Sequence, residues 1–538
     1  MNQPTQASLA NAGFDESQPC SKLWRCWEAW LILLVFVIFA GDPTPGINEA
    51  HYLAKAKQFW QPDWCANDLF VTSGKAHTTF YWTFGWWTRF VSLDAAAWIG
   101  RLIGWSMLAI GWQRLCWAIA PKRYVSPLAA CIWIVGIQYG NLAGEWVVGG
   151  IEAKVPAYAF VLFALERMVC RRWSWVWPLL GAASAFHVLV GGWSVLAAGL
   201  VWIASGKRRG SLVRQLLPLA IGGGLALFGL LPALWLSAGT APEDAVAAAR
   251  TYVYERIPHH LLPADFPAHW YIRHGVLILL TAAIVAIQPI GKRLQDLTLF
   301  TIGAVLLAGI GLVIGMLPES HPDLAAKLLR YYWFRLTDAA VPLLLAIATV
   351  RLFVVDCRWG KKCGWAIAIP LSVASVACIA WLGIERQQVN LPASCDRAAQ
   401  GHAQETSMAE RQEVFQEWKR VCQWIQENTD PDAVFLTPRH QQTFKWYAER
   451  AEVVNFKDVP QDVPNLKIWQ TRFDDVFPPE LGRFRVTIQY SELLRYREQY
   501  GAKYMVVDRR AVPYRLPLQS LYPTPLTKNK YYAVYQLP

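Results

Sequence analysis

Long apolar runs, separated by short polar segments, fill the chain as far as residue 384. Several of them approach the roughly 20 residues that a helix needs to cross a bilayer. We count eleven, at 24–40, 95–119, 125–141, 153–169, 174–188, 190–205, 213–237, 273–290, 297–317, 334–354 and 363–384. This pattern predicts a polytopic all-α membrane domain over residues 24–384.

One further run, 77–93, is also apolar enough to cross. Counting it as a span would move every later basic loop to the outside of the membrane. We therefore predict that 77–93 is an aromatic helix lying in the outer interface. It then belongs to a long external loop, 41–94.

Basic residues between the runs predict the orientation. They cluster at Lys122-Arg123, Arg171-Arg172, Lys207-Arg208-Arg209, Lys292-Arg293, and Arg358 with Lys361-Lys362. Loops rich in Lys and Arg stay in the cytoplasm. We expect an integral protein of the inner (cytoplasmic) membrane, with residues 1–23 as a cytoplasmic tail and the C-terminal domain outside.

Composition agrees with a membrane protein. Of 538 residues, 54% are hydrophobic and 17% charged, against about 25% charged in soluble proteins. The net charge of +12 is therefore attributed to cytoplasmic loops, and the lipid bilayer, with no nucleic acid, is the expected partner. The 29 Trp suit interfacial belts, and the 11 Cys show no zinc-ligand spacing.

Beyond the last run the pattern changes. Residues 385–412 are polar and predict a linker, and 413–538 alternate helical segments such as EVFQEWKRVCQWIQEN and SELLRYREQYG with short β-rich runs. Those runs are AVFLTP, AEVVNF, KYMVVD and YYAVYQL. Alternation of this kind predicts a small extracytoplasmic α/β domain.

The external loop begins with NEAHYLAKAKQFW, residues 48–60, whose spacing predicts a short helix with Glu49 in its first turn. The stretch resembles the Asp-Glu-x-x-Tyr-x-x-x-Ala helix of the GT-C superfamily, membrane glycosyltransferases that use polyprenyl-phosphate sugars. Tyr81-Trp82 and Arg101-Leu102 also resemble positions of that superfamily, as do AGEWVVGGIEAK and RYYWFRLTDAAVPLLLA. NE-x-HYL and AGEWVVGG further resemble a bacterial branch of it.

The resemblance implies a sugar transfer from a polyprenyl-phosphate donor to a glycan, lipid or protein acceptor. Attack by an acceptor hydroxyl needs a base, and Glu49 is the candidate, with Glu152 as a second acid. Asn48 stands where many relatives carry an acid. A solvated helix start is the alternative for Glu49, and for Glu152 a simple pair with Lys154 or a helix cap.

The departing polyprenyl phosphate needs positive charge, for which Lys154, Arg330 and Arg335 are candidates. Interfacial snorkelling is their alternative. Asn48, His51 and His187 complete the candidate substrate-binding set, although a lone histidine such as His187 is often structural.

The sequence does not identify a cofactor. A divalent metal, Mg²⁺ or Mn²⁺, is compatible with the resemblance. No nucleotide is expected, because no GxxxxGK motif occurs. Two other classes compete with an enzyme. One is a transporter or lipid flippase, and the other is a non-catalytic protein that binds envelope polymers.

Overall fold

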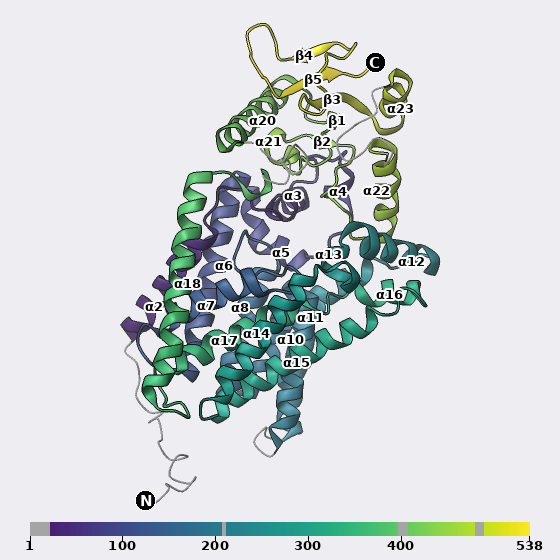
Figure 1. Cartoon of the computed structure of the whole chain (residues 1–538). Helices are drawn as coiled ribbons and strands as arrows, with labels where there is room; N and C mark the ends of the chain where they lie inside the picture. The colour runs from purple at the N-terminus through teal and green to yellow at the C-terminus, as the bar shows by residue number, and fades with distance from the viewer. Residues whose placement is uncertain (1–21, 207–210, 396–406, 479–488) are drawn as a thin grey trace, which may run out of the picture.

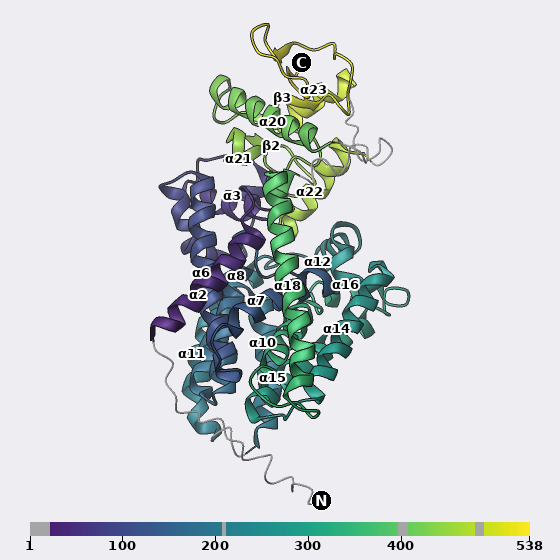
Figure 2. The ribbon, with the colours of Figure 1, turned by 60° about the vertical axis from the view of Figure 1, so that its left-hand side comes forward.

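The computed structural model describes residues 22–206, 211–395, 407–478 and 489–538. A body of long helices forms one part, and a smaller part with a β-sheet lies against one end of it (Figure 1; Figure 2). The basic cluster at 207–209 and the N-terminal tail to residue 21 lie outside the described residues.

Each of the predicted apolar runs lies on a helix. These helices are α2 (Lys22–Ala40), α6 (Leu93–Ile119), α7 (Val125–Gly140), α8 (Lys154–Val169), α9 (Trp173–Phe186), α10 (Val188–Ala204), α11 (Leu212–Trp235), α14 (Ala268–Ala286), α15 (Lys292–Ile314), α17 (Arg335–Arg351) and α18 (Lys361–Val389). Among the described residues, α6, α11, α14, α15 and α18 are long and apolar enough to cross a membrane, and shorter apolar helices accompany them. The protein is therefore an integral membrane protein with several spans.

Short helices fill the loops at the end that carries the sheet. Loop 41–94 contains α3 (Glu49–Trp60), α4 (Leu69–Thr72), α5 (Thr78–Trp82) and the 3₁₀ helix η1 (Phe84–Arg89). The segment 77–93 thus forms two short helices where the sequence predicted one aromatic helix, and neither is long enough to span a membrane. The loop after α11 contains α12 (Pro242–Arg250), the π-helix η3 (Thr251–Arg256), α13 (Pro258–Leu261) and η4 (Pro263–Asp265), and α16 (Pro322–Leu329) precedes α17.

The loops with basic clusters meet at the opposite end. Arg293 donates to the carbonyl oxygen of Ala118 at 2.7 Å, and Lys122 donates to that of Phe353 at 3.1 Å. Arg171 pairs with Asp296 at 2.8 Å. These contacts join four of the described loops that the sequence predicts to be on one side of the membrane.

Helix α11 packs one face against α9 and exposes the other at the surface of the membrane part. Gly181 of α9 and Gly222 of α11 approach so closely that a Cβ on Gly181 would lie 2.1 Å from the Gly222 carbonyl oxygen. The other face of α11 is apolar and open, with Leu217 70% and Phe228 66% exposed. Such a surface suits lipid.

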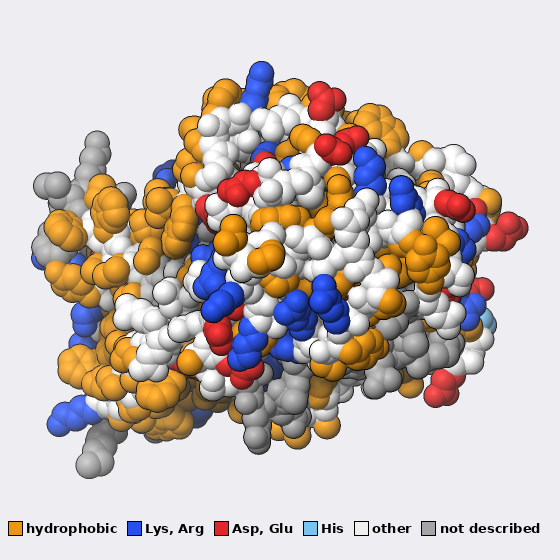
Figure 3. Space-filling view, turned by 90° about the horizontal axis from the view of Figure 1, so that it is seen from above, with side chains coloured by type: hydrophobic (Ala, Val, Ile, Leu, Met, Phe, Trp, Pro, Cys, Tyr) orange, Lys and Arg blue, Asp and Glu red, His pale blue; other side chains and the backbone are white. Residues whose placement is uncertain are grey.

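The surface at the end that carries the sheet differs from that of α11. Charged side chains of both signs are mixed there with hydrophobic ones (Figure 3).

The C-terminal part is a small mixed sheet with helices. It comprises α20 (Met408–Asn428), β1 (Val434–Leu436), α21 (Phe444–Ala448), β2 (Ala451–Glu452), α22 (Val463–Val476), α23 (Tyr490–Tyr500), β3 (Ala502–Asp508), β4 (Ser520–Tyr522) and β5 (Tyr532–Gln536). The strand order is β2-β1-β3-β5-β4. Strands β2, β1 and β3 are parallel, whereas β5 runs antiparallel to both β3 and β4. The four predicted strands are present, and β4 was not predicted.

The sheet part contacts loop 41–94 through the segments that follow β1. Gln442 donates to the carbonyl oxygen of Ile47 at 3.2 Å, and the Trp446 indole donates to Asp94 at 3.2 Å. Lys57 of α3 pairs with Glu449 at 2.8 Å. The C-terminal part therefore lies directly above α3, the helix that carries the candidate acid (Figure 1).

Candidate active site

Glu49 opens α3 and is buried, with 1% of the residue exposed. Its Oε1 accepts from Arg101 Nε at 2.7 Å and from the Ile151 amide at 2.6 Å. Its Oε2 accepts from Arg101 Nη2 at 2.6 Å and from the Gly46 amide at 2.6 Å. A carboxylate has about four lone-pair positions, so every acceptor position of Glu49 is occupied.

The loop between α7 and α8, residues 141–153, is called the α7–α8 loop, and its close approach to Glu49 depends on Gly150. A Cβ at this position would lie 2.7 Å from Glu49 Cδ. A tight turn at Gly149 and Gly150 would be one way to aim Glu152 at Glu49. In the structure Gly150 instead gives the backbone room to approach Glu49, and Glu152 points to other partners.

Six other side chains form a connected group that we call the polar centre: Asn48, Glu145, Glu152, Lys154, His187 and Arg335. Asn48 Nδ2 donates to Glu152 Oε2 at 2.8 Å. Lys154 Nζ lies 3.0 Å from Glu152 Oε1 and 3.3 Å from Glu145 Oε1. Five of these six residues were candidates from the sequence, and Glu145 belongs to the same AGEWVVGGIEAK segment.

Arg335 completes the polar centre from the first turn of α17. Its Nε lies 2.8 Å from Glu145 Oε2, and its Nη1 donates to His187 Nε2 at 2.8 Å. Because a guanidinium only donates, His187 Nε2 must accept, which requires an imidazole unprotonated at that nitrogen. The Tyr332 ring lies 4.2 Å from the guanidinium carbon. His187, at the junction of α9 and α10, is thus a hydrogen-bonded partner of Arg335.

Asp338 was not among the candidates, although it holds the α7–α8 loop in place. Its carboxylate accepts from the amides of Leu142 at 2.6 Å, Ala143 at 2.9 Å and Glu145 at 3.3 Å. The only sequence signal was an acid in an otherwise apolar run. Asp338 therefore fixes the backbone from which Glu145 projects.

Tyr52 and His77, neither of which was a candidate site residue, form a pair beside His187. The Tyr52 hydroxyl is 3.3 Å from His77 Nε2, and the His77 ring centroid is 5.5 Å from that of His187. Burial lowers the pKa of His77 to about 4. His77 is therefore neutral at neutral pH and adds no charge to the polar centre.

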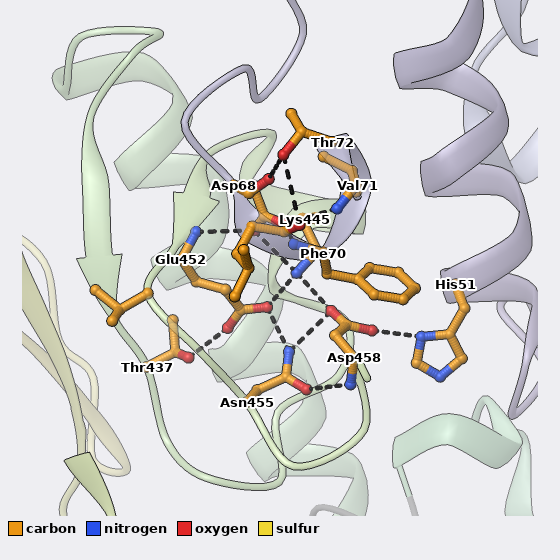
Figure 4. Close-up of polar contacts among 12 residues, drawn as sticks. His51, Asp68, Phe70, Val71, Thr72, Thr437, Lys445, Glu452, Asn455 and Asp458 are labelled. Atoms are coloured by element: carbon orange, nitrogen blue, oxygen red, sulfur yellow. Dashed lines mark hydrogen bonds and ion pairs between the residues drawn. The ribbon is translucent and has the colours of Figure 1, made fainter. Parts of the chain in front are cut away.

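His51 and Arg330 do not join the polar centre. His51 faces the C-terminal part and pairs with Asp458 (Figure 4). Burial lowers its pKa against the opposing effect of Asp458. Arg330 ends α16, half-buried, and its side chain has no hydrogen bond or ion pair with another described residue. The structure thus places two of the predicted substrate-binding residues elsewhere.

The partner of His51 belongs to a buried cluster around Lys445 (Figure 4). Lys445 Nζ lies 2.5 Å from Glu452, 2.5 Å from Asp458 and 3.2 Å from Asp68 of loop 41–94. Burial raises the pKa of Glu452 to about 7. Burial also acts to raise the pKa of Asp458, but Lys445 and His51 hold it well below its usual range.

Comparison with known proteins gives one family model and several structures. The model "Domain of unknown function (DUF6798)" matches residues 416–476, the segment that contains Lys445, Glu452 and Asp458. No curated protein matches the chain by sequence.

Two structures follow nearly the whole chain. The crystal structure of ArnT from Cupriavidus metallidurans bound to undecaprenyl phosphate has 14% identity and a TM-score of 0.47, covering 96% of this chain and 99% of that one. Archaeal oligosaccharyltransferase AglB from Archaeoglobus fulgidus, in complex with an inhibitory peptide and a dolichol-phosphate, has 11% identity and a TM-score of 0.45, covering 95% and 74%. These likenesses concern the course of the chain alone.

Proposed function

We propose that the protein is a membrane glycosyltransferase that moves a sugar from a polyprenyl-phosphate donor to a glycan, lipid or protein acceptor on the extracytoplasmic face. The observation that carries the proposal is the polar centre. Two acids and a lysine from the segment AGEWVVGGIEAK meet Asn48, an arginine of α17 and a histidine between α9 and α10. Buried charges of this kind are costly unless they have a role or partners.

The chemistry needs an acid with a free lone pair. A base must point a lone pair at the acceptor hydroxyl as the new bond to the sugar carbon forms. Glu49 has none to offer until Arg101 or a backbone amide moves away. Glu152 is held only by Asn48 and Lys154 among the described residues, one donor on each oxygen. Glu152 is therefore the better placed base, and Glu49 positions the loop that carries it.

The same group supplies positive charge for the leaving phosphate. Arg335 is anchored by Glu145 and His187 while its planar guanidinium retains further N–H donors. A guanidinium can bind two oxygens of one phosphate side by side. We assign Arg335 to the donor phosphate, with Lys154 as the second cation.

The distribution of charge supports the proposed orientation. The basic loops gather at the end opposite the C-terminal part. We propose eleven spans in the inner membrane, the N-terminus in the cytoplasm and the C-terminal domain outside, with residues 24–384, 385–412 and 413–538 as membrane domain, linker and α/β domain. The polar centre then faces the extracytoplasmic side.

The test is transfer of labelled sugar from polyprenyl-phosphate donors by the purified full-length protein. We expect transfer with at least one donor, and a fall of roughly 10²–10⁴-fold in Glu152→Gln. Glu319→Gln is a matched control, because Glu319 is an exposed acid in a loop at the same end. Equal turnover in Glu152→Gln and wild type would remove Glu152 from the mechanism, and no transfer with any donor would contradict the proposed function.

A further inference from the structure

Glu145 and Glu152, both in the α7–α8 loop, converge on the ammonium group of Lys154. Lys154 Nζ lies between Glu145 and Glu152, at 3.3 and 3.0 Å, and 3.8 Å from the centroid of the Trp146 ring. The three charged side chains are 7%, 6% and 3% exposed. Two acids that enclose a cation are the arrangement in which an enzyme often binds a divalent metal, but here the cation belongs to the chain.

The residues present do not fit Mg²⁺ or Mn²⁺. Such ions need several oxygen ligands in near-octahedral geometry. Each carboxylate oxygen of Glu145 and Glu152 lies 2.8–3.3 Å from a nitrogen of Lys154, Arg335 or Asn48. Lone pairs remain on these oxygens, but a metal ion bound to them would lie directly beside two cations, which repel it. Over the described residues no group of three or more His, Cys, Asp or Glu is arranged to hold a metal ion.

The charge balance leads to the same result. Glu145 and Glu152 carry two negative charges, and Lys154 and Arg335 carry two positive charges, so the polar centre is neutral. An added divalent cation would leave two uncompensated charges in a buried site, which is costly. An acid at position 48 would raise the negative charge, but Asn48 is neutral and donates its amide to Glu152.

We infer that the Lys154 ammonium takes the place of a divalent cation in this site. It orients Glu152 and supplies positive charge beside Arg335, and sugar transfer needs no added metal. The inference rests on the proposed function for its catalytic part. Its structural part, that Lys154 occupies the cation position between two acids, can be tested without any turnover.

The experiment uses Mn²⁺ itself as the probe, followed by electron paramagnetic resonance on the metal-free, full-length protein. We expect the wild type to have no Mn²⁺ site that depends on Glu152. Lys154→Ala removes the ammonium and leaves both acids, so it should gain a bound Mn²⁺ and a higher melting temperature in its presence. The double variant Lys154→Ala with Glu152→Gln should lose that binding.

A Mn²⁺ site in the wild type that disappears in Glu152→Gln would overturn the inference, and this measurement stands even where Lys154→Ala does not fold. A folded Lys154→Ala that binds no Mn²⁺ would overturn it as well. The two proposals fail separately. Transfer that stops with chelator and returns with Mn²⁺ refutes the lysine inference and leaves the glycosyltransferase. Absent transfer with the expected Mn²⁺ pattern refutes the glycosyltransferase and leaves the lysine in the cation position.

Discussion

Replacing Glu49 with Gln tests whether this carboxylate belongs to the scaffold or to the chemistry. Glutamine keeps the size of the side chain, and its carbonyl oxygen can accept from two of the four donors around Glu49. Its NH₂ group then faces the other two, which are left without an acceptor. Arg101 also loses the charge that it pairs with at 2.6 Å.

The magnitude follows from these lost contacts. Removing one partner of a buried ion pair costs about 3–5 kcal/mol, and each buried donor left without an acceptor costs about 1–3 kcal/mol. Arg101 keeps its bond to the carbonyl oxygen of Asp42 at 2.5 Å and its contact with the Trp98 ring. We therefore expect Glu49→Gln to destabilise the fold by about 3 kcal/mol, at the lower end of the ion-pair range.

Two measurements separate the roles. Thermal melting in detergent, followed by tryptophan fluorescence, reports stability, and sugar transfer per folded molecule reports turnover. Glu49→Gln should melt earlier with turnover near that of the wild type. Glu152→Gln, which loses only the contacts to Asn48 and Lys154, should lose turnover with a smaller change in melting.

One result would refute this reasoning. If Glu49→Gln melts with the wild type and loses turnover by the roughly 10²–10⁴-fold expected of a missing base, then Glu49 is the base. The bonds around it must in that case open during the reaction.

Three further predictions concern other regions. Arg335→Ala should weaken binding of labelled polyprenyl phosphate, and Arg335→Lys should restore it only partly, because lysine lacks the planar guanidinium; unchanged affinity in both would leave Arg335 as an interfacial anchor. Folding raises the pKa of Glu452 from 4.5 to about 7, so the protonated carboxyl stabilises the folded state. This stabilisation is complete below pH 4.5 and is lost as the pH rises through about 7. The wild type should melt higher at about pH 5.5 than at about pH 8, by a margin that Glu452→Gln reduces, and an unchanged margin would contradict this. In intact cells, Leu526→Cys, 96% exposed, should react with an impermeant thiol reagent above the wild-type background, and Lys361→Cys only after permeabilisation; the reverse pattern would invert the topology.

The helices of the membrane part were predictable because lipid imposes one rule on every span. A run of apolar residues must satisfy its backbone internally, and only a helix does so within one segment. The C-terminal strands were predictable where β-rich residues form a run, as in KYMVVD. Strand β4, Ser520–Tyr522, is three residues long and leaves no such pattern.

The sequence predicted most residues of the polar centre but not the contacts between them. Short motifs gave Asn48, Glu152, Lys154, His187 and Arg335, which the structure brings together. The sequence could not tell which way α3 faces around its axis. That rotation depends on packing against segments far along the chain, and it points His51 away from the polar centre.

Asp338 and Arg101 were missed as partners for a related reason. Each looks like an isolated charge near the end of an apolar run, where snorkelling to the interface is the ordinary explanation. Their roles depend on backbone amides and a carboxylate supplied by other loops. Such partners are set by tertiary structure, and no local pattern encodes them.

The cluster around Lys445 has a consequence for how the protein is made. Asp68 accepts from the backbone amide of Glu452, 384 residues later in the chain, and also contacts Lys445. Since ribosomes synthesise the chain from its N-terminus, loop 41–94 leaves the membrane insertion machinery long before its partners exist. During that interval Asp68 has only local partners such as the amides of Phe70 and Val71. Its contacts with the C-terminal part therefore form last. A chain that ends before residue 445 cannot join loop 41–94 to the C-terminal part through this cluster.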